Sequence, residues 1–293
     1  MEPDRADKKR DTELVSEIMP EEQNDNQGSI LTARYALWVI VALAAGLRLY
    51  LVFTAQGINS DAWRYAETAR KMASDGLLAG MRGDFLWPYY PLNPHLFFFP
   101  FLGSILLHVT GDAVLSLRLV SAAAGVGLVP LGYAIARRLL EKEGIGLMAA
   151  LFLAVHSEFA RASASVYREV LVAFLIAFAL YLVLRVIQEE DRKYLSVALA
   201  GAILFLAFAT RVEAIVAAIG CGLVILFLAG SINWKKRIAL CAVMSTVFLA
   251  LEIPYILWMR KESGLWLVNQ WQISREAKAG EFIEKRIENR AGP

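Results

Sequence analysis

Residues 168–187 read REVLVAFLIAFALYLVLRVI, and no charged residue lies between Glu169 and Arg185. A helix needs about 20 mostly apolar residues to cross the ~30 Å hydrocarbon layer of a membrane. Similar stretches recur along the chain, and we predict membrane spans at 35–54, 113–136, 144–160, 168–187, 194–210, 212–230 and 238–258. The predicted fold class is therefore an all-α, polytopic membrane helical bundle with seven spans.

The composition of the chain excludes a soluble globular domain. Hydrophobic residues make up 57% of the 293 residues and charged residues only 20%. In soluble domains about half of the residues are hydrophobic and about a quarter are charged. The net charge of +2 and the lack of a basic patch predict no nucleic-acid partner. The two cysteines, Cys221 and Cys241, lie inside apolar blocks, where we expect them to be buried. Two thiols in such positions are too few for a disulfide framework or a metal site. We expect neither a metal nor a cofactor.

The distribution of Lys and Arg predicts the orientation in the membrane. Basic residues gather before span one and in the loops at 137–142, 185–193 and 235–237. These groups all fall on one side if the segment 55–112 does not cross, and the side rich in Lys and Arg is normally cytoplasmic. The apolar run from Leu96 to Leu107 has 12 residues and contains Pro100. Because such a helix reaches only ~18 Å, we predict that it is a juxtamembrane helix on the outer face. With no crossing in 55–112, the basic groups place the N-terminus in the cytoplasm. We therefore predict a multi-pass protein of the plasma (inner) membrane.

Three regions follow from this pattern. Residues 1–34 are polar and carry mixed charge, which is typical of a disordered cytosolic tail. Residues 35–258 form the seven-span module. Residues 259–293 form a tail on the outer face, and two interpretations of it stay open: it ends the protein, or it begins a further C-terminal part.

The outer segments carry ionisable residues that the membrane topology does not require, and such residues often mark a site. Asp61 opens a short amphipathic helix whose apolar face comprises Ala62, Tyr65, Ala66, Ala69, Met72 and Ala73. Its polar face comprises Asp61, Arg64, Thr68, Lys71 and Asp75. Asp61 has two interpretations: an acid that stabilises the first turn of a helix through the helix dipole, or a catalytic carboxylate held at a helix start.

Three further groups of candidate residues face the same side. Tyr90 and His95 flank two prolines in YYPLNPH (89–95), a pattern that also fits an interfacial aromatic belt. Glu158, Arg168 and Glu169 lie near the outer surface, where mutual ion pairing is the alternative. In the short Thr210–Glu213 turn, Arg211 either binds a phosphate at the membrane surface or pairs with Glu213.

In order and spacing these pieces resemble the GT-C superfamily of membrane glycosyltransferases, with protein O-mannosyltransferases and lipid A aminoarabinose transferases as the nearest branches. The resemblance rests on Ser60-Asp61, Tyr90–Pro94, Leu117–Ala122, Tyr133–Leu139, Tyr167–Glu169 and Thr210–Glu213. It implies a seven-span module with two juxtamembrane helices in the first outer loop. It also implies a polyprenyl-phosphate sugar as donor and, by position, Asp61 as the catalytic base. Ala62 departs from the pattern, since many relatives have a second acid there.

The resulting hypothesis is an inverting glycosyltransferase that moves a sugar from a polyprenyl-phosphate donor to a lipid, glycan or protein acceptor on the outer face, among membrane lipids. The catalytic residues would be Asp61 and Glu158. The substrate-binding residues would be Arg64, Tyr90, His95, Arg168, Glu169, Arg211 and Glu213. The alternative is a transporter or flippase for lipid-linked sugars, or a catalytically silent scaffold. The acids lie at the outer face and not in mid-span, which favours an enzyme.

Overall fold

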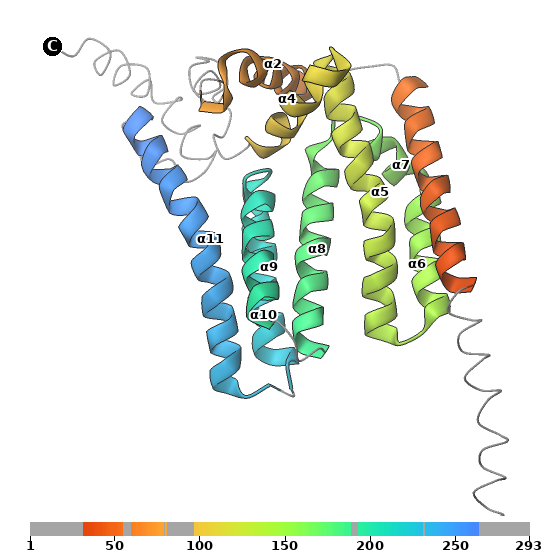
Figure 1. Ribbon diagram of the computed structural model, residues 1–293, viewed down its shortest axis with the longest axis vertical. Helices are drawn as coiled ribbons and strands as arrows, with labels where there is room; N and C mark the ends of the chain where they lie inside the picture. Colours follow the sequence, from red (N-terminus) through yellow and green to blue (C-terminus); the bar gives the residue numbers. More distant parts are fainter. Residues whose placement is uncertain are drawn as a thin grey trace, which may run out of the picture.

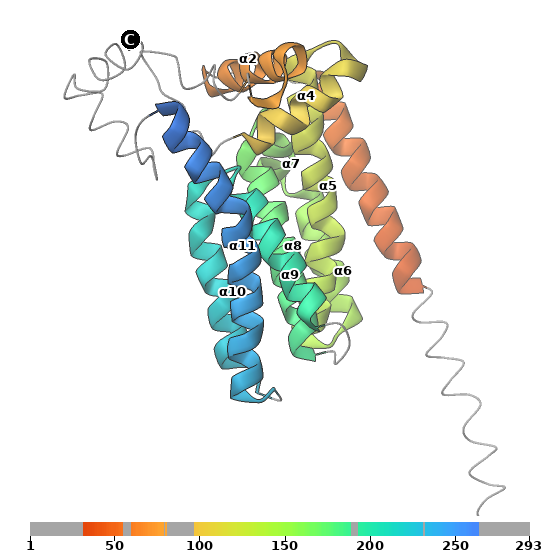
Figure 2. The same cartoon turned by 60° about the vertical axis from the view of Figure 1, so that its left-hand side comes forward.

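The computed structural model describes residues 32–54, 60–78, 80, 97–188, 193–230 and 232–263. Tyr90 and His95, nearly all of the predicted tail 1–34, and the segment from 264 onward lie outside these ranges. The described residues are organised as helices that stand side by side, with α2 and α4 lying across one end of the bundle (Figures 1 and 2). This confirms the predicted all-α bundle.

The bundle begins with the helix Thr32–Thr54. The two helices across its end are α2 (Ser60–Asp75) and α4 (Phe98–Thr110). The remaining helices are α5 (Ala113–Leu140), α6 (Glu143–Val155), α7 (Ser157–Ser163), α8 (Arg168–Gln188), α9 (Lys193–Phe208), the 3₁₀ turn η1 (Val212–Ala214), α10 (Ile215–Leu228) and α11 (Trp234–Ser263). Thr32 to Arg34 therefore belong to a helix and not to the predicted tail, and α11 continues past the predicted end at Trp258.

A helix occupies the position of every predicted span, but the helices differ in length. Among the described residues four helices are long and apolar enough to cross a membrane, or five if the bent pair α6–α7 is one span. These four are Thr32–Thr54, Ala113–Leu140, Arg168–Gln188 and Trp234–Trp258. With 16 and 14 residues, α9 and α10 reach only ~24 and ~21 Å at 1.5 Å per residue. The structure thus establishes a polytopic protein, and the seven-span count stays a prediction.

The predicted span 144–160 is not one straight helix. Its helix ends at Val155, and α7 continues at an angle of 61°. The bend exposes carbonyl groups at the end of α6, which have no partner within their own helix. Arg48, which is fully buried in the first helix, donates from Nη1 to the Ala154 carbonyl at 3.1 Å and from Nη2 to the Leu153 carbonyl at 2.9 Å. A distant arginine therefore satisfies the broken helix end.

The same arginine also contacts the helix beyond the bend and the wall of α5. Its guanidinium carbon lies 5.4 Å from the centre of the Phe159 ring in α7. Gly125 of α5 leaves room for it, because a Cβ there would stand 2.9 Å from Arg48 Nε and 2.3 Å from Ser163 Oγ. Arg48 thus joins the first helix, α6 and α7 in one packed unit.

The apolar run that we predicted as a juxtamembrane helix is α4. Its first residues are tied to the end of α9, since the Phe98 amide donates to the Ala209 carbonyl at 3.2 Å. Gly111, in the left-handed conformation with φ of 69°, ends the helix. Asp112 then caps α5 by accepting a hydrogen bond from the Leu115 amide at 2.7 Å. The sharp turn returns the chain from the end of the bundle into α5 (Figure 1).

Candidate active site

Six charged residues and one tyrosine gather at the end of the bundle that α2 and α4 cover. The polar cluster, as we name it, combines three elements far apart in the sequence: α2, the start of α8, and the turn between α9 and α10. Its members are Asp61, Arg64, Tyr65, Arg168, Glu169, Arg211 and Glu213. Three are arginines and three are acids, so the cluster carries both signs of charge in equal number.

The amphipathic pattern of α2 orients this helix. Ala62, Tyr65 and Ala66 are buried against α4 and α5, whereas Asp61 is exposed. The rings of Tyr65 and Phe99 of α4 meet edge to face with centres 5.6 Å apart. One residue differs from the prediction, which placed Thr68 on the polar face: Thr68 is buried. Its hydroxyl donates to the Arg64 carbonyl at 3.0 Å, so it does not need water as a partner.

Arg168 connects α8 to α2. Its guanidinium carbon lies 5.6 Å from the centre of the Tyr65 ring, an arrangement in which a cation is attracted to the ring face. Arg168 Nε lies 3.6 Å from Glu169 Oε1. Its Nη1 is buried and has no hydrogen-bond partner within the part of the chain that the structure describes. Unmade hydrogen bonds of charged groups are costly, so this atom is able to donate to a further acceptor.

Arg211 connects α8 to the turn before α10. Its Nη1 donates to Glu169 Oε1 at 2.9 Å, and its Nε donates to Glu213 Oε2 at 3.1 Å. Both local pairs considered from the sequence, Arg168–Glu169 and Arg211–Glu213, are therefore present. The pair Arg211–Glu169, 42 positions apart, was not predicted, because nothing in the local sequence indicates it.

Burial and charge set the protonation of two members of the cluster. Burial, opposed by Arg168 and reinforced by Asp61, raises the pKa of Tyr65 to about 12. Its hydroxyl therefore stays protonated at physiological pH. Desolvation raises the pKa of Glu213, but a backbone hydrogen bond and the neighbouring Arg211 outweigh it and lower the pKa below its usual value. Glu213 is thus held as a carboxylate. The charges that act on Tyr65 come from α2, with Asp61 and Arg64, and from α8, with Arg168 and Glu169.

Glu158 lies apart from these residues. It is an exposed residue of α7 and pairs with Arg161 one turn further along the same helix. That helix packs mainly against α5 and α6. The structure therefore brings together six of the charged candidates from the sequence, while Glu158 faces solvent elsewhere and Tyr90 and His95 lie outside the described residues.

Two features escaped the sequence reasoning. Tyr65 was expected only as an apolar contact of α2, yet its ring also makes a cation–π contact with the Arg168 guanidinium. Glu252 is 4% exposed and lies in α11 within a predicted span. An acid inside an apolar span was the signal that could have found it, because charges at membrane depth are costly and seldom without a role.

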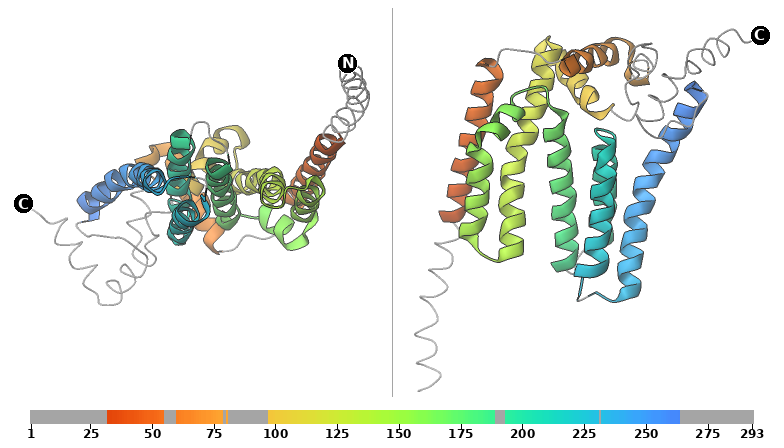
Figure 3. Two further views of the ribbon diagram at one scale, coloured as in Figure 1. Left: turned by 90° about the horizontal axis from the view of Figure 1, so that it is seen from below. Right: turned by 180° about the vertical axis from the view of Figure 1, so that it is seen from behind.

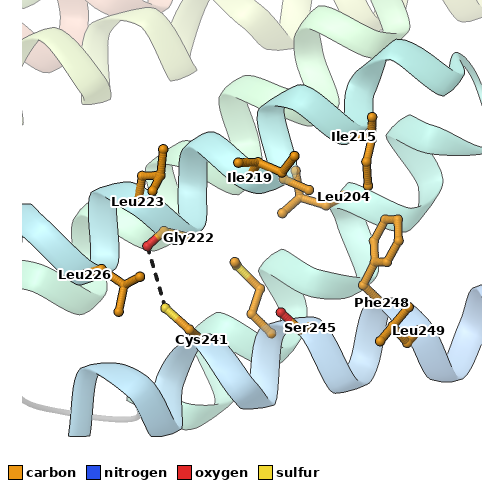
Figure 4. A pocket seen from close by; sticks show the side chains of 12 residues that line it. Leu204, Ile215, Ile219, Gly222, Leu223, Leu226, Cys241, Ser245, Phe248 and Leu249 are labelled. Carbon is orange, nitrogen blue, oxygen red and sulfur yellow. Dashed lines mark hydrogen bonds between the residues drawn. The ribbon is translucent and has the colours of Figure 1, made fainter. Parts of the chain in front are cut away.

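An apolar pocket lies directly beyond the polar cluster, between α9, α10 and α11 (Figure 4). Its volume is about 390 Å³, and Ile215, the first residue of α10, lines it four positions after Arg211. At its other end the Cys241 thiol lies 3.6 Å from the Gly222 carbonyl. Its lining comprises Leu204, Ile215, Ala218, Ile219, Gly222, Leu223, Leu226, Cys241, Met244, Ser245, Phe248 and Leu249.

Comparison with protein families gives one match. The family model described as dolichyl-phosphate-mannose-protein mannosyltransferase matches residues 94–258, more than half of the chain. The match runs from just before α4 to near the end of α11 and includes Arg168, Glu169, Arg211 and Glu213. It begins after Asp61. Comparisons with curated proteins and with solved structures gave no significant match.

Proposed function

Because the chain belongs to the dolichyl-phosphate-mannose-protein mannosyltransferase family and is thus a membrane glycosyltransferase of the GT-C type, we propose that it transfers a sugar from a polyprenyl-phosphate donor to an acceptor on the outer face, with inversion. The observation that carries this proposal is the pair of arginines at the polar cluster. Arg168 has a buried Nη1 with no hydrogen-bond partner among the described residues, and Arg211 is held by the neighbouring acids Glu169 and Glu213. Guanidinium groups suit phosphate because they donate two parallel hydrogen bonds.

The donor's phosphate would lie against these arginines and its lipid chain in the apolar pocket. That pocket begins at the first residue of α10, immediately beyond the turn that carries Arg211. A polyprenyl chain needs apolar surface, whereas a phosphate needs fixed positive charge. The two requirements are met on adjacent parts of one surface, which supports a lipid-linked phosphate as the substrate class.

In the proposed reaction, Asp61 takes the proton from the acceptor hydroxyl while the acceptor oxygen forms a bond to the anomeric carbon. The bond between that carbon and the phosphate oxygen breaks, and the lipid phosphate leaves with the electron pair. Arg168 and Arg211 stabilise the negative charge that develops on the leaving phosphate. Asp61 and Tyr65 are neighbours one helical turn apart, so the proposed base stands close to the residue that supports Arg168.

The remaining candidates have smaller proposed roles. Three of them, Arg64, Glu169 and Glu213, would position the sugar hydroxyls and the two arginines that bind the phosphate. Tyr90, His95 and Glu158 stay predictions for acceptor or donor binding. A transporter of lipid-linked sugars would bind the same donor but would release no polyprenyl phosphate, so product release separates the two functions.

We expect Arg168→Gln and Arg211→Ala each to weaken donor binding roughly tenfold or more. Loss of a charge-assisted phosphate contact in a partly dry site costs about 1.5–3 kcal/mol. Arg211→Lys should recover only part of the affinity, because an ammonium group cannot make the bidentate contact. Donor affinity is measured by titrating the full-length protein, in lipid nanodiscs, with a polyprenyl-phosphate sugar.

The matched control for donor binding is Arg70→Gln. Arg70 lies in α2 at the same end of the bundle and pairs with Glu67 at 3.5 Å, outside the polar cluster. Its removal should leave donor affinity unchanged. Equal affinity in Arg168→Gln, Arg211→Ala and the wild type would contradict the phosphate assignment and reduce both arginines to structural ion pairs.

The proposed orientation predicts which end of the bundle faces outward. In a background with Cys221 and Cys241 replaced by alanine, Ser74→Cys in α2 should react with an impermeant thiol reagent added to intact cells. Lys142→Cys, at the start of α6 and the opposite end of the bundle (Figure 1), should react only after the cells are opened. Both native residues are exposed. The reverse labelling pattern would place the polar cluster on the cytoplasmic side and contradict the proposal that the acceptor lies on the outer face.

A further inference from the structure

Tyr65 is the uncharged member of the polar cluster, and the proposed reaction assigns no step to it. It belongs to α2, the helix that also carries Asp61, and α2 lies across the end of the bundle where α8 begins (Figure 3, right). Its ring contacts Arg168, the first residue of α8. The tyrosine therefore lies between the helix of the proposed base and an arginine of the proposed phosphate site.

Packing fixes the position of the Tyr65 ring. The side chain is 4% exposed, and its ring meets the buried ring of Phe99 in α4 edge to face, with an angle of 86° between the two planes. The start of α4 is tied in turn to the end of α9 by the hydrogen bond from the Phe98 amide to the Ala209 carbonyl. Because close-packed side chains have little room to move, the ring offers its partner a fixed surface.

The acid beside Arg168 is shared with a second arginine. Arg168 Nε lies 3.6 Å from Glu169 Oε1, which is longer than a hydrogen bond. The same oxygen accepts a hydrogen bond from Arg211 Nη1 at 2.9 Å. Glu169 therefore holds Arg211 more closely than Arg168. The Tyr65 ring, whose centre lies 5.6 Å from the Arg168 guanidinium carbon, supplies a further contact that holds this guanidinium.

The contact between Tyr65 and Arg168 is a cation–π contact and not an ion pair. Burial, opposed by Arg168 and reinforced by Asp61, raises the pKa of Tyr65 to about 12. The ring is therefore neutral at physiological pH, and the attraction comes from the electron density of its face. Such contacts are strongest where water is excluded. Here the arginine side chain is only 17% exposed, so the contact is mostly desolvated.

We propose that Tyr65 is a positioning residue for sugar transfer: its ring holds the Arg168 guanidinium so that the buried Nη1 is directed at the donor's phosphate. This inference rests on the proposed function, because it takes Arg168 as a phosphate ligand. Nη1 has no hydrogen-bond partner among the described residues, and a guanidinium that is already oriented loses less freedom when the phosphate binds. Since Tyr65 and Asp61 lie one helical turn apart, the same ring links the place of the base to that of the leaving phosphate.

The test changes the electron density of the ring and keeps its shape. Phenylalanine and its fluorinated forms replace Tyr65 in the full-length protein, and donor affinity is titrated in lipid nanodiscs with a polyprenyl-phosphate sugar. Tyr65→Phe should keep most of the wild-type affinity, because the ring face remains. Each added fluorine withdraws electron density, so the affinity should fall stepwise. With pentafluorophenylalanine it should be roughly fivefold or more below that of Tyr65→Phe.

A double-mutant cycle separates this role from packing. In an Arg168→Gln background the fluorinated ring should change donor affinity by less than about twofold, because no cation is left for the ring to hold. The matched control is Trp63, whose ring centre lies 5.3 Å from the guanidinium carbon of Arg70 in the same helix, outside the polar cluster. Trp63→Leu removes a contact of the same kind and should leave donor affinity unchanged.

Two results would overturn the positioning role while leaving Arg168 as a phosphate ligand. One is equal donor affinity across the fluorinated series, and the other is an equal loss in the wild-type and Arg168→Gln backgrounds. A failure of the proposed function looks different: Arg168→Gln by itself would then bind the donor as tightly as the wild type, and the role of Tyr65 would fall together with the phosphate assignment.

Discussion

Asp61→Asn should lower the rate of sugar transfer by about 10²–10⁴-fold, the usual contribution of a general base, while donor binding stays nearly constant. Asparagine keeps the shape of the side chain but cannot accept a proton at working pH. Because the native side chain is exposed, the exchange should leave folding and membrane insertion intact. The rate is measured as release of polyprenyl phosphate by the full-length protein in lipid, with acceptor present.

The same helix supplies a matched control for this variant. Asp75 is an exposed acid at the other end of α2, and Asp75→Asn should transfer sugar at the wild-type rate. Asp61→Glu should retain a little activity, since the carboxylate survives but is displaced by one methylene. A wild-type rate for Asp61→Asn would eliminate the proposed mechanism, leave Asp61 as an acid that stabilises a helix start, and make Glu158→Gln the next variant to measure.

Arg48→Leu should lower the free energy of unfolding by about 2–6 kcal/mol, because the carbonyls of Leu153 and Ala154 would lose their donors in an apolar setting, at about 1–3 kcal/mol each. Leucine fills most of the space and adds no polar atom, so the effect reports the lost contacts of the guanidinium, which also include a hydrogen bond to the Ala44 carbonyl at 3.2 Å and the Phe159 ring. Equilibrium unfolding in mixed micelles measures the change.

Arg34→Leu is the control for Arg48. It makes the same substitution in the same helix, at an exposed position, and should change the stability by no more than about 0.5 kcal/mol. A stability of Arg48→Leu equal to that of the wild type would show that the bend between α6 and α7 holds without the arginine, for example by admitting water to the carbonyls.

The sequence was a good guide wherever one element's own pattern carried the information. The apolar face of α2 and the location of α4 followed from helical spacing and from the length of an apolar run, both of which are local properties. The ion pairs Arg168–Glu169 and Arg211–Glu213 also join residues close in the chain. The bend inside the predicted span 144–160 was not predicted, since the carbonyls at the break are satisfied by Arg48, which the local sequence does not contain.

By itself the sequence determined that the chain is a helical membrane protein and that its unexplained charges fall in a few short segments. A hydrocarbon layer imposes a minimum apolar length, and that requirement is readable residue by residue. Only the tertiary structure decided which charges meet. Arg211 reaches Glu169 across 42 positions and Arg48 reaches Leu153 across 105, because helices in a bundle place distant residues at one level through packing that no local pattern encodes.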